Sequence, residues 1–295
     1  MKTVQVLLST YNGGKYLERQ LDSIFDQKEV KVKLLVRDDG STDNTRKILE
    51  KYKKKFSLTI ILGSNLGFAR SFWRLVQKAN NADYYAFCDQ DDIWENDKLI
   101  SAVKKIEDKH LSSSVPVLYT SNVTAINNNL KVIKKKAFAF DGVLTFPDSL
   151  QRSVLPGCTF VFNDALLKYA RKYNGKIIAH DWLMYQLAEL FGIVVYDSKP
   201  HMKYRIHEGN TIGISSPAQE LVDKIKRQFT TRDVPRRSEI AQNILNTYTY
   251  EIPANKKRVL KLFTQAKSPQ NWYKILKIKE YRNVDFILML LLGRI

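Results

Sequence analysis

The sequence predicts an α/β protein with a mostly parallel β-sheet, flanked by helices and followed by a basic, helical C-terminal extension. In the first 110 residues a short apolar run, a polar loop and a segment with helical apolar spacing recur four times. This rhythm is typical of parallel sheets with helices on both faces. A polar loop rich in Gly, Asn or Asp follows each strand, and in such a sheet these loops share one edge.

Apolar periodicity places the elements of the first half. We expect strands at residues 4–9, 32–36, 58–62 and 84–88. Helical spacing of apolar residues predicts helices around 17–25, from about 44, around 72–76 and around 99–106. The loops that meet at the sheet edge are then residues 10–14, 38–43, 63–67 and 89–92.

After residue 110 the pattern is less regular. We expect strands at 117–121, within 155–162 and at 193–196, and a turn or hairpin at 127–136. Helices are expected at 165–172, with Asp164 as a possible cap, and from His180 onward. Residues 203–210 form a dense polar cluster, and from about residue 217 the chain is helical and basic. The predicted units are a domain at 1–215, with halves 1–110 and 111–215, and a C-terminal region at 216–295.

The 295 residues carry a formal charge of +18, which favours anionic partners such as phosphates, nucleic acid or an anionic membrane. Residues 221–295 hold 16 Lys/Arg and 6 Asp/Glu, so this region supplies +10 of the total. Cys88 and Cys158 lie in apolar surroundings, which fits reduced core thiols of a cytosolic protein. The N-terminal residues do not resemble a signal peptide, and the apolar run at 287–292 is too short to span a bilayer.

Three carboxylates stand within four positions at the end of the strand at 84–88: Asp89, Asp91 and Asp92. Acids this close repel one another unless a positive group lies between them. A hard divalent cation fits, because Mg²⁺ is usually held by one or two carboxylates together with substrate phosphate oxygens. The alternative is an acidic turn that caps the next helix.

Asp38 and Asp39 follow the second strand and reach the same edge. An ionised carboxylate accepts hydrogen bonds, so these acids suit a ribose hydroxyl or a base N–H. The alternative is a turn, since Asp-Gly-Ser-Thr-Asp-Asn is good turn chemistry by itself. One acid pair would then hold a nucleoside and the other a metal-bound diphosphate.

Taken together, Leu8-Ser9-Thr10-Tyr11-Asn12-Gly13, Arg37-Asp38-Asp39-Gly40-Ser41-Thr42-Asp43 and Asp89-Gln90-Asp91-Asp92 resemble the family 2 glycosyltransferases. The order and spacing match across the first 110 residues, and the resemblance continues more loosely to about residue 213. It implies a GT-A (Rossmann-like) fold, a nucleotide-sugar donor, Mg²⁺ or Mn²⁺ as cofactor, and inversion at the anomeric carbon. Residues 1–110 would bind the nucleotide-sugar and residues 111–215 the acceptor.

The resemblance also assigns residues on the donor side. The metal ligands would be Asp89 and Asp91 of the Asp-x-Asp motif, joined by His207. Nucleotide contacts would come from Thr10, Tyr11, Asn12, Asp38, Asp39, Asp89, Gln90 and Arg205. Arg205 and His207 suit this part of the site because Arg forks onto phosphate oxygens and His ligates metals. An ordinary surface loop is the alternative for that segment.

Attack by an acceptor hydroxyl requires a group that takes its proton. The family places an acid at the start of a helix about 90 residues after the metal motif, and that position is Asp181 in this chain. Many members have Glu-Asp there, whereas this chain has His180-Asp181. His180 therefore remains an alternative base, and a helix cap is the alternative role for Asp181.

Acceptor-facing residues are expected around these acids. Gly157, Cys158 and Thr159 lie where the family often contacts the acceptor, although a core strand would also explain them. Trp94 and Trp182 flank the candidate acids and could stack on sugar rings or fill the core. His180 belongs to the same predicted set. Asp92 is open between a third metal ligand, an acceptor contact and a cap of the next helix.

The C-terminal region alternates apolar residues with Lys and Arg between Trp272 and Arg282. An apolar side with a basic side suits a surface helix on an anionic membrane. The alternative is a helix packed on the domain with a solvated basic face. Membrane contact would fit a glycan or polyprenyl-diphosphate-linked acceptor and a cytoplasmic enzyme at the inner face of the plasma membrane.

The sequence therefore predicts an inverting, metal-dependent glycosyltransferase of bacterial surface polysaccharide synthesis (capsule, O-antigen or cell wall). The closest resemblance is to enzymes that transfer L-rhamnose from dTDP-rhamnose, and a UDP-hexose donor is the alternative. A sugar-phosphate nucleotidyltransferase is more remote, since the first loop has no basic residue until Lys15. We expect no nucleic-acid binding, because acids at the sheet edge would repel phosphates in the absence of a metal.

Overall fold

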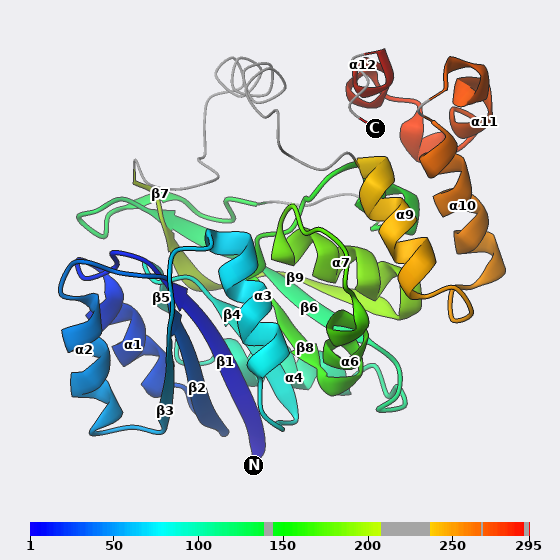
Figure 1. Cartoon of the computed structure of the whole chain (residues 1–295). Helices are drawn as coiled ribbons and strands as arrows, with labels where there is room; N and C mark the ends of the chain where they lie inside the picture. The colour runs from blue at the N-terminus through cyan, green and yellow to red at the C-terminus, as the bar shows by residue number, and fades with distance from the viewer. Residues whose placement is uncertain (139–143, 208–236, 267, 292–294) are drawn as a thin grey trace.

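The computed structural model describes residues 1–138, 144–207, 237–266, 268–291 and 295. Within these residues nine strands form one sheet, with helices on both faces and a separate group of helices at the C-terminal end (Figure 1). The predicted boundary at residues 215–216 lies outside the described residues, as do residues 208–210 of the predicted polar cluster.

Four parallel strands form the first half of the sheet in the order β3-β2-β1-β4. Their bounds are Lys2–Thr10 for β1, Val30–Asp38 for β2, Leu58–Leu62 for β3 and Tyr84–Cys88 for β4. The connecting helices are α1 (Leu17–Phe25), α2 (Thr45–Lys53), α3 (Phe68–Lys78) and α4 (Lys98–Glu107). Each predicted strand and helix of residues 1–110 is present. The structure adds a short strand, β5 (Ile93–Trp94), that the sequence pattern did not indicate.

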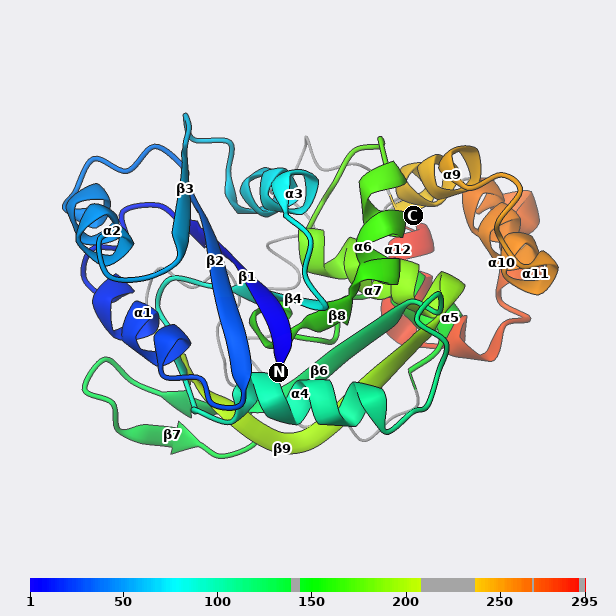
Figure 2. The same ribbon diagram turned by 90° about the horizontal axis from the view of Figure 1, so that it is seen from below.

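The second half of the sheet is mixed. β8 (Val161–Asn163) runs antiparallel to β4 and to β6 (Val117–Ile126), while β9 (Ile193–Arg205) runs parallel to β6. β5 pairs with β9, and β7 (Val132–Lys134) pairs with the end of β6, as a hairpin at 127–136 predicts. Figure 2 shows β9 as a long, curved strand that passes α4. Its last residues pair with β5, so the polar segment at the end of β9 lies against residues from the first half of the chain.

Helices of the second half are α5 (Phe146–Gln151), α6 (Asp164–Lys172) and α7 (His180–Phe191), with a 3₁₀ helix η1 (Gly157–Thr159) before β8. α6 begins as predicted, but its cap is Asn163, whose side chain accepts a hydrogen bond from the Leu166 amide at 3.1 Å. The expectation that Asp164 caps this helix was wrong by one residue. α7 is buried on most sides, as its many apolar residues require.

Apolar side chains form a separate buried cluster on each face of the sheet, because successive side chains of a strand point to opposite faces. Val4, Val6 and Leu8 pack against α1, α2 and α4 on one face. Leu7 and Phe87 join α3, α6 and α7 on the other. Cys88 and Cys158 are free, buried thiols, which confirms the prediction of reduced core cysteines.

The C-terminal helices share the second of these clusters. These helices are α9 (Arg237–Thr247), α10 (Ala254–Gln265), α11 (Trp272–Ile275) and α12 (Val284–Leu291), with short 3₁₀ turns η2 (Pro269–Asn271) and η3 (Lys279–Tyr281) on either side of α11. α9 lies beside α7, α10 packs against α9, and α11 packs against α10 (Figure 1). Residues 269–281 form a series of short turns rather than one amphipathic helix, with Ile275 and Tyr281 buried. None of the described helices combines the length and hydropathy that crossing a bilayer requires.

Candidate active site

The candidate site forms where the first parallel strands end. Thr10 pairs with Asp38 across β1 and β2, and Leu8 pairs with Cys88 across β1 and β4. The loops after these strands therefore start side by side, because parallel neighbours deliver their carboxyl ends to one edge. The loop after β3 approaches through Asp38, whose carbonyl accepts a hydrogen bond from Gly63 N at 3.0 Å.

Gln90 joins the loop after β4 to the loop after β1. Its Oε1 accepts hydrogen bonds from Thr10 Oγ1 at 2.6 Å and from the Tyr11 amide at 2.9 Å. Its Nε2 donates to the Tyr11 carbonyl at 3.2 Å. A Cβ on Gly13 would lie 2.3 Å from Gln90 Oε1, so a larger residue at position 13 would displace the Gln90 side chain. Tyr11 is left 45% exposed at the rim, the only member of this group positioned to offer a ring to a ligand.

Asn12 closes the loop after β1 onto the loop after β2. Its amide donates to Ser41 Oγ at 2.9 Å, and its Oδ1 accepts from the Thr42 amide at 2.9 Å. Asn12 has φ 49°, a left-handed conformation that Asn tolerates better than most residues. Asn12 is therefore a loop-fixing residue in this structure.

Asp38 and Asp39 are both buried, and their carboxylates contact other residues of the protein at this edge of the sheet. Asp38 pairs with Arg46 Nε at 2.6 Å. Asp39 pairs with Arg37 and accepts hydrogen bonds from the Leu66 and Gly67 amides at 2.9 Å each. Their carboxylates are thus engaged with the chain itself, and these contacts fix the loops at this edge of the sheet. The sequence did not indicate Arg37 or Arg46 as the partners.

The end of β9 covers the acidic loop. Asp91 Oδ2 and His207 Nε2 lie 2.7 Å apart, and Arg205 Nε donates to the Asp91 carbonyl at 2.8 Å. The Arg205 amide donates to Asp92 Oδ1 at 3.1 Å. The structure therefore brings Arg205 and His207 to the acids although more than 110 residues separate them in sequence.

Crowding of negative charge is evident in the pKa values of these acids. Burial and the neighbouring charges of Asp91 and Asp181 raise the pKa of Asp89 to about 7. Burial, Asp91 and Asp89 raise the pKa of Asp92 well above its usual range. A cation at this point would relieve the repulsion.

The donor atoms present fit a hard divalent ion. Carboxylate oxygens and an imidazole are suitable ligands for Mg²⁺ or Mn²⁺. Among the described residues Asp92 Oδ2 is buried without a hydrogen-bond partner. Potential ligand atoms of Asp89, Asp92 and Cys158 also lie within 4.8 Å of one another. Burial raises the pKa of the Cys158 thiol well above its ordinary value, so a protonated thiol is a poor ligand and we favour the oxygen donors.

Lys98 is a buried cation beside this cluster that the sequence reasoning missed. Its side chain is fully buried, and Nζ lies 3.8 Å from the centroid of the Trp94 ring. Burial lowers the pKa of Lys98 to about 8, while the charges of Asp92 and Asp89 act in the opposite direction. The sequence signal that could have indicated a buried lysine is its position at helical spacing among the apolar residues Leu99, Ala102 and Val103.

Asp181 approaches from the opposite side, at the start of α7. Its Oδ1 accepts a hydrogen bond from the Trp182 amide at 2.8 Å. A Cβ on Gly157 would lie 2.6 Å from Asp181 Cβ, so glycine lets η1 pass beside this acid. Burial raises the pKa of Asp181 to about 6, which brings it close to the range in which a carboxylate is an effective base. Its charge contributes to the raised pKa of Asp89, so the two acids lie close enough to interact electrostatically.

His180 is enclosed by aromatic rings. Its ring stacks on Phe72 at 3.9 Å and meets the edge of Phe87 at 4.8 Å between centroids. Burial lowers the pKa of His180 to about 3. An imidazole with so low a pKa binds a proton weakly, so the surroundings favour Asp181 as the base.

The other residues that were predicted to contact the acceptor are mostly buried. Trp94 is 3% exposed, and Trp182 is 9% exposed with Nε1 donating to the Ser149 carbonyl at 2.6 Å. Thr159 is buried and bonded to Thr120 through their hydroxyls at 2.8 Å. Gly157 and Cys158 lie against Asp181 and Asp92, so they shape the space between the acids.

Tyr16 is a further residue that the sequence did not reveal. Its ring stacks on His207 at 5.2 Å, and the Arg205 guanidinium lies 4.8 Å from the ring centroid. Its hydroxyl donates to Asn128 Oδ1 at 3.0 Å. Tyr16 thereby contacts both the Arg205 and the His207 side chains at the end of β9.

Residues 5–169 match the family model described as "Glycosyl transferase family 2". A dTDP-rhamnosyl transferase, RfbG of Shigella flexneri, is 32% identical over 250 residues, covering 80% of this chain and 82% of that protein. The chain belongs to glycosyl transferase family 2. A putative teichuronic acid biosynthesis glycosyltransferase, TuaG of Bacillus subtilis (strain 168), is 28% identical over 165 residues, covering 55% of this chain and 62% of that protein.

Solved structures confirm the fold of this family 2 glycosyltransferase. S. aureus TarS in complex with UDP-GlcNAc has a TM-score of 0.59 at 18% identity, covering 100% of this chain and 90% of that one. The mannosyltransferase PcManGT from Pyrobaculum calidifontis, in complex with GDP-Man and Mn²⁺, has a TM-score of 0.56 at 16% identity, covering 98% and 72%. The predicted GT-A fold and the predicted transferase class are confirmed.

The raised pKa of Asp181 predicts how stability depends on pH. The pKa in the folded protein is about 6, above the unfolded value of about 3.9, so the contribution of this group to stability is present below about pH 4 and is lost as pH rises through 6. Between pH 4 and pH 8, ionisation of this group should lower the unfolding free energy of the wild type by about 2–3 kcal/mol. Asp181→Asn should lack this part of the decrease. Urea unfolding with EDTA present measures this, with the exposed Asp26→Asn as control. Equal pH profiles for Asp181→Asn and wild type would contradict it.

Proposed function

We propose that the chain is an inverting, metal-dependent glycosyltransferase that moves L-rhamnose from dTDP-rhamnose to a glycan or a polyprenyl-diphosphate-linked acceptor in bacterial surface polysaccharide synthesis. The observation that supports this proposal is the pairing of Asp91 with His207, 2.7 Å apart, next to Asp89, whose pKa is raised by the charge of Asp181. In this proposal Asp89, Asp91 and His207 form a metal-binding group on the donor side, and Asp181 is the acid on the acceptor side.

Each part of the site has a role in this reaction. Asp89 and Asp91, with His207, would hold Mg²⁺ or Mn²⁺, which supplies electrostatic stabilisation of the departing nucleoside diphosphate. Arg205 lies beside the same acids with a guanidinium suited to phosphate oxygens. Asp181 takes the proton of the acceptor hydroxyl as that oxygen attacks the anomeric carbon. Attack opposite to the leaving group gives inversion, and no covalent enzyme intermediate is required.

The donor sugar is inferred from the similarity to the Shigella flexneri dTDP-rhamnosyl transferase, which extends over most of both chains. A UDP-hexose donor is the second candidate. It is favoured by the structural similarity to TarS, whose complex contains UDP-GlcNAc. The two donors would require different sugar pockets, whereas the proposed metal and base would be the same for both.

A donor panel tests the proposal. Thermal unfolding with Mn²⁺ and dTDP-rhamnose at about 100 times Kd should raise Tm by about 5 °C or more, since a ligand of the folded state stabilises it by mass action. Asp91→Ala should abolish the metal-dependent part of the shift, and the exposed Asp108→Ala should retain it. A larger shift with UDP-hexoses would replace the rhamnose assignment. A full shift in Asp91→Ala would remove Asp91 from the metal site.

The base assignment has its own test. Asp181→Asn should keep the donor-induced Tm shift and lower kcat about 10²–10⁴-fold, the usual contribution of a general base. His180→Phe, which preserves an aromatic ring between Phe72 and Phe87, should stay within about ten-fold of wild type. Steady-state kinetics at saturating donor measure both. Loss of turnover in His180→Phe together with activity in Asp181→Asn would exchange the roles.

We further propose that the enzyme works at the cytoplasmic face of the plasma membrane and contacts anionic lipid through its C-terminal helices. α12 leaves Ile287, Leu288 and Leu291 40%, 44% and 63% exposed while Phe286 and Met289 are buried. Tyr273 is 60% exposed, and exposed lysines surround it in α11 and beyond. Exposed apolar groups with basic neighbours suit peripheral attachment to anionic membranes.

Vesicle binding tests the membrane contact. Replacing Ile287, Leu288 and Leu291 by Gln should reduce co-sedimentation with vesicles that contain phosphatidylglycerol, because the exposed apolar groups would no longer enter the interface. A matched control replaces Leu130, Val132 and Ile133, which are 39%, 46% and 53% exposed around β7. Equal binding by the α12 variant and wild type would favour helices that only pack on the domain.

A further inference from the structure

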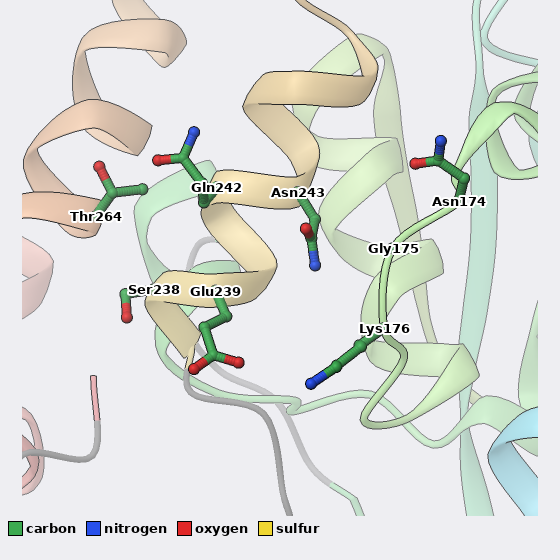
Figure 3. Close-up of a pocket in the computed structure, with 8 residues that line it drawn as sticks. All are labelled: Asn174, Gly175, Lys176, Ser238, Glu239, Gln242, Asn243 and Thr264. Carbon is green, nitrogen blue, oxygen red and sulfur yellow. The ribbon is translucent and has the colours of Figure 1, made fainter.

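A pocket lies outside the acidic site, between the α6–α7 loop and the C-terminal helices. Its volume is about 420 Å³, within the range of small-molecule sites. Figure 3 shows α9 with Glu239 and Asn243 beside the loop of Asn174, Gly175 and Lys176, and Lys176 extending toward Glu239. Gln242 of α9 and Thr264 of α10 complete the polar lining.

The walls of this pocket are fixed to one another. Thr247 Oγ1 donates to Asn174 Oδ1 at 3.2 Å, and Tyr173 OH donates to the Lys176 carbonyl at 2.8 Å. A Cβ on Gly175 would lie 2.7 Å from Asn243 Cβ, so the loop passes directly against α9. A pocket with walls held in this way needs little ordering when a ligand binds.

The chemistry of the lining suits an uncharged polyhydroxyl ligand. Side-chain amides offer both donors and acceptors, as sugar hydroxyls require, and Thr264 adds a hydroxyl. Lys176 and Glu239 are the charged residues among the described lining, and their charges cancel. In a chain of formal charge +18, a pocket with no net charge is a poor site for phosphate and a suitable one for neutral sugar residues.

The position of the pocket connects it with the candidate base. Lys176 and Asp181 are five residues apart, and an extended chain of that length spans at most about 18 Å. The segment between them packs on the core through Ile177, Ile178 and Ala179 and leads directly into α7. A glycan whose attacking hydroxyl is at Asp181 could therefore reach the pocket with residues further along its chain.

We propose that this pocket, which we call the α9 pocket (Asn174, Lys176, Glu239, Gln242, Asn243 and Thr264), binds neutral sugar residues of the acceptor glycan away from the point of transfer. The inference rests on the proposed glycosyltransferase function and adds an acceptor subsite built partly by the C-terminal helices. Longer acceptors fill both the transfer site and the α9 pocket, and short ones fill the transfer site alone. Preference for longer acceptors then follows from the added contacts.

Binding without turnover tests the α9 pocket. The probes are immobilised neutral oligosaccharides of two to six sugars, rhamnose-containing series included, with nucleoside diphosphate and Mn²⁺ present and no donor sugar. Wild type should bind at least one longer oligosaccharide more tightly than its disaccharide. Gln242→Ala/Asn243→Ala should weaken that binding at least about five-fold, as expected for two lost hydrogen bonds, and leave disaccharide binding unchanged. The matched control Asn255→Ala/Gln265→Ala removes the same amides from exposed positions of α10 and should bind as wild type.

The outcomes separate this inference from the proposed function. Wild-type binding of the longer oligosaccharide by the pocket variant, or no length preference in the wild type, would overturn the α9 pocket as an acceptor subsite. Equal weakening in the control would also overturn it, because the loss would then not depend on the pocket. The donor-induced Tm shift is measured on the same proteins. Failure of that shift in the wild type would count against the proposed function instead.

Discussion

Repulsion among the carboxylates of Asp89, Asp91, Asp92 and Asp181 is the constraint on which the site depends. Burial makes it more costly, as the pKa of about 7 for Asp89 and about 6 for Asp181 show. The chain offsets part of this charge with Arg205 from the end of β9 and Lys98 from α4, and His207 lies against Asp91. In the proposed reaction, a divalent ion would offset the remaining negative charge.

The long return of β9 makes this charge balance possible. Its pairing with β6 and β5 spans both halves of the sheet and ends at Arg205, directly over the acidic loop. Tyr16 then holds the Arg205 and His207 side chains against the loop after β1. The residues around the acidic loop therefore come from both halves of the domain. The division into a nucleotide-binding half at 1–110 and an acceptor half at 111–215 stays a prediction. In the proposed reaction, Arg205 and His207 of the second half would also contact the donor.

Sequence reasoning was strongest where a local pattern determines the structure. The four strands of the first half and the loops after them follow from apolar runs and from the Gly and Asp residues that end them. The roles of Asp89, Asp91 and Asp181, which come from the family resemblance, stay predictions. Sequence reasoning was weakest for contacts between distant segments. No local signal shows whether Asp38 binds a nucleoside or pairs with Arg46. In the same way, no residue near Trp94 in the sequence indicates that its ring lies against Lys98. β5 and η1 are too short for periodicity to reveal.

The C-terminal helices belong to the same physical unit as the catalytic sheet. Ile240, Phe263 and Phe286 are buried in the cluster that also contains Phe87, Leu183 and Leu187, so α7 is held between the sheet and the C-terminal helices. This packing holds an acid at the start of α7 in a fixed position. A general base needs a fixed position because proton transfer depends on hydrogen-bond geometry. The basic extension thus has a structural task that does not depend on membrane contact: it completes the burial of the helix that positions Asp181.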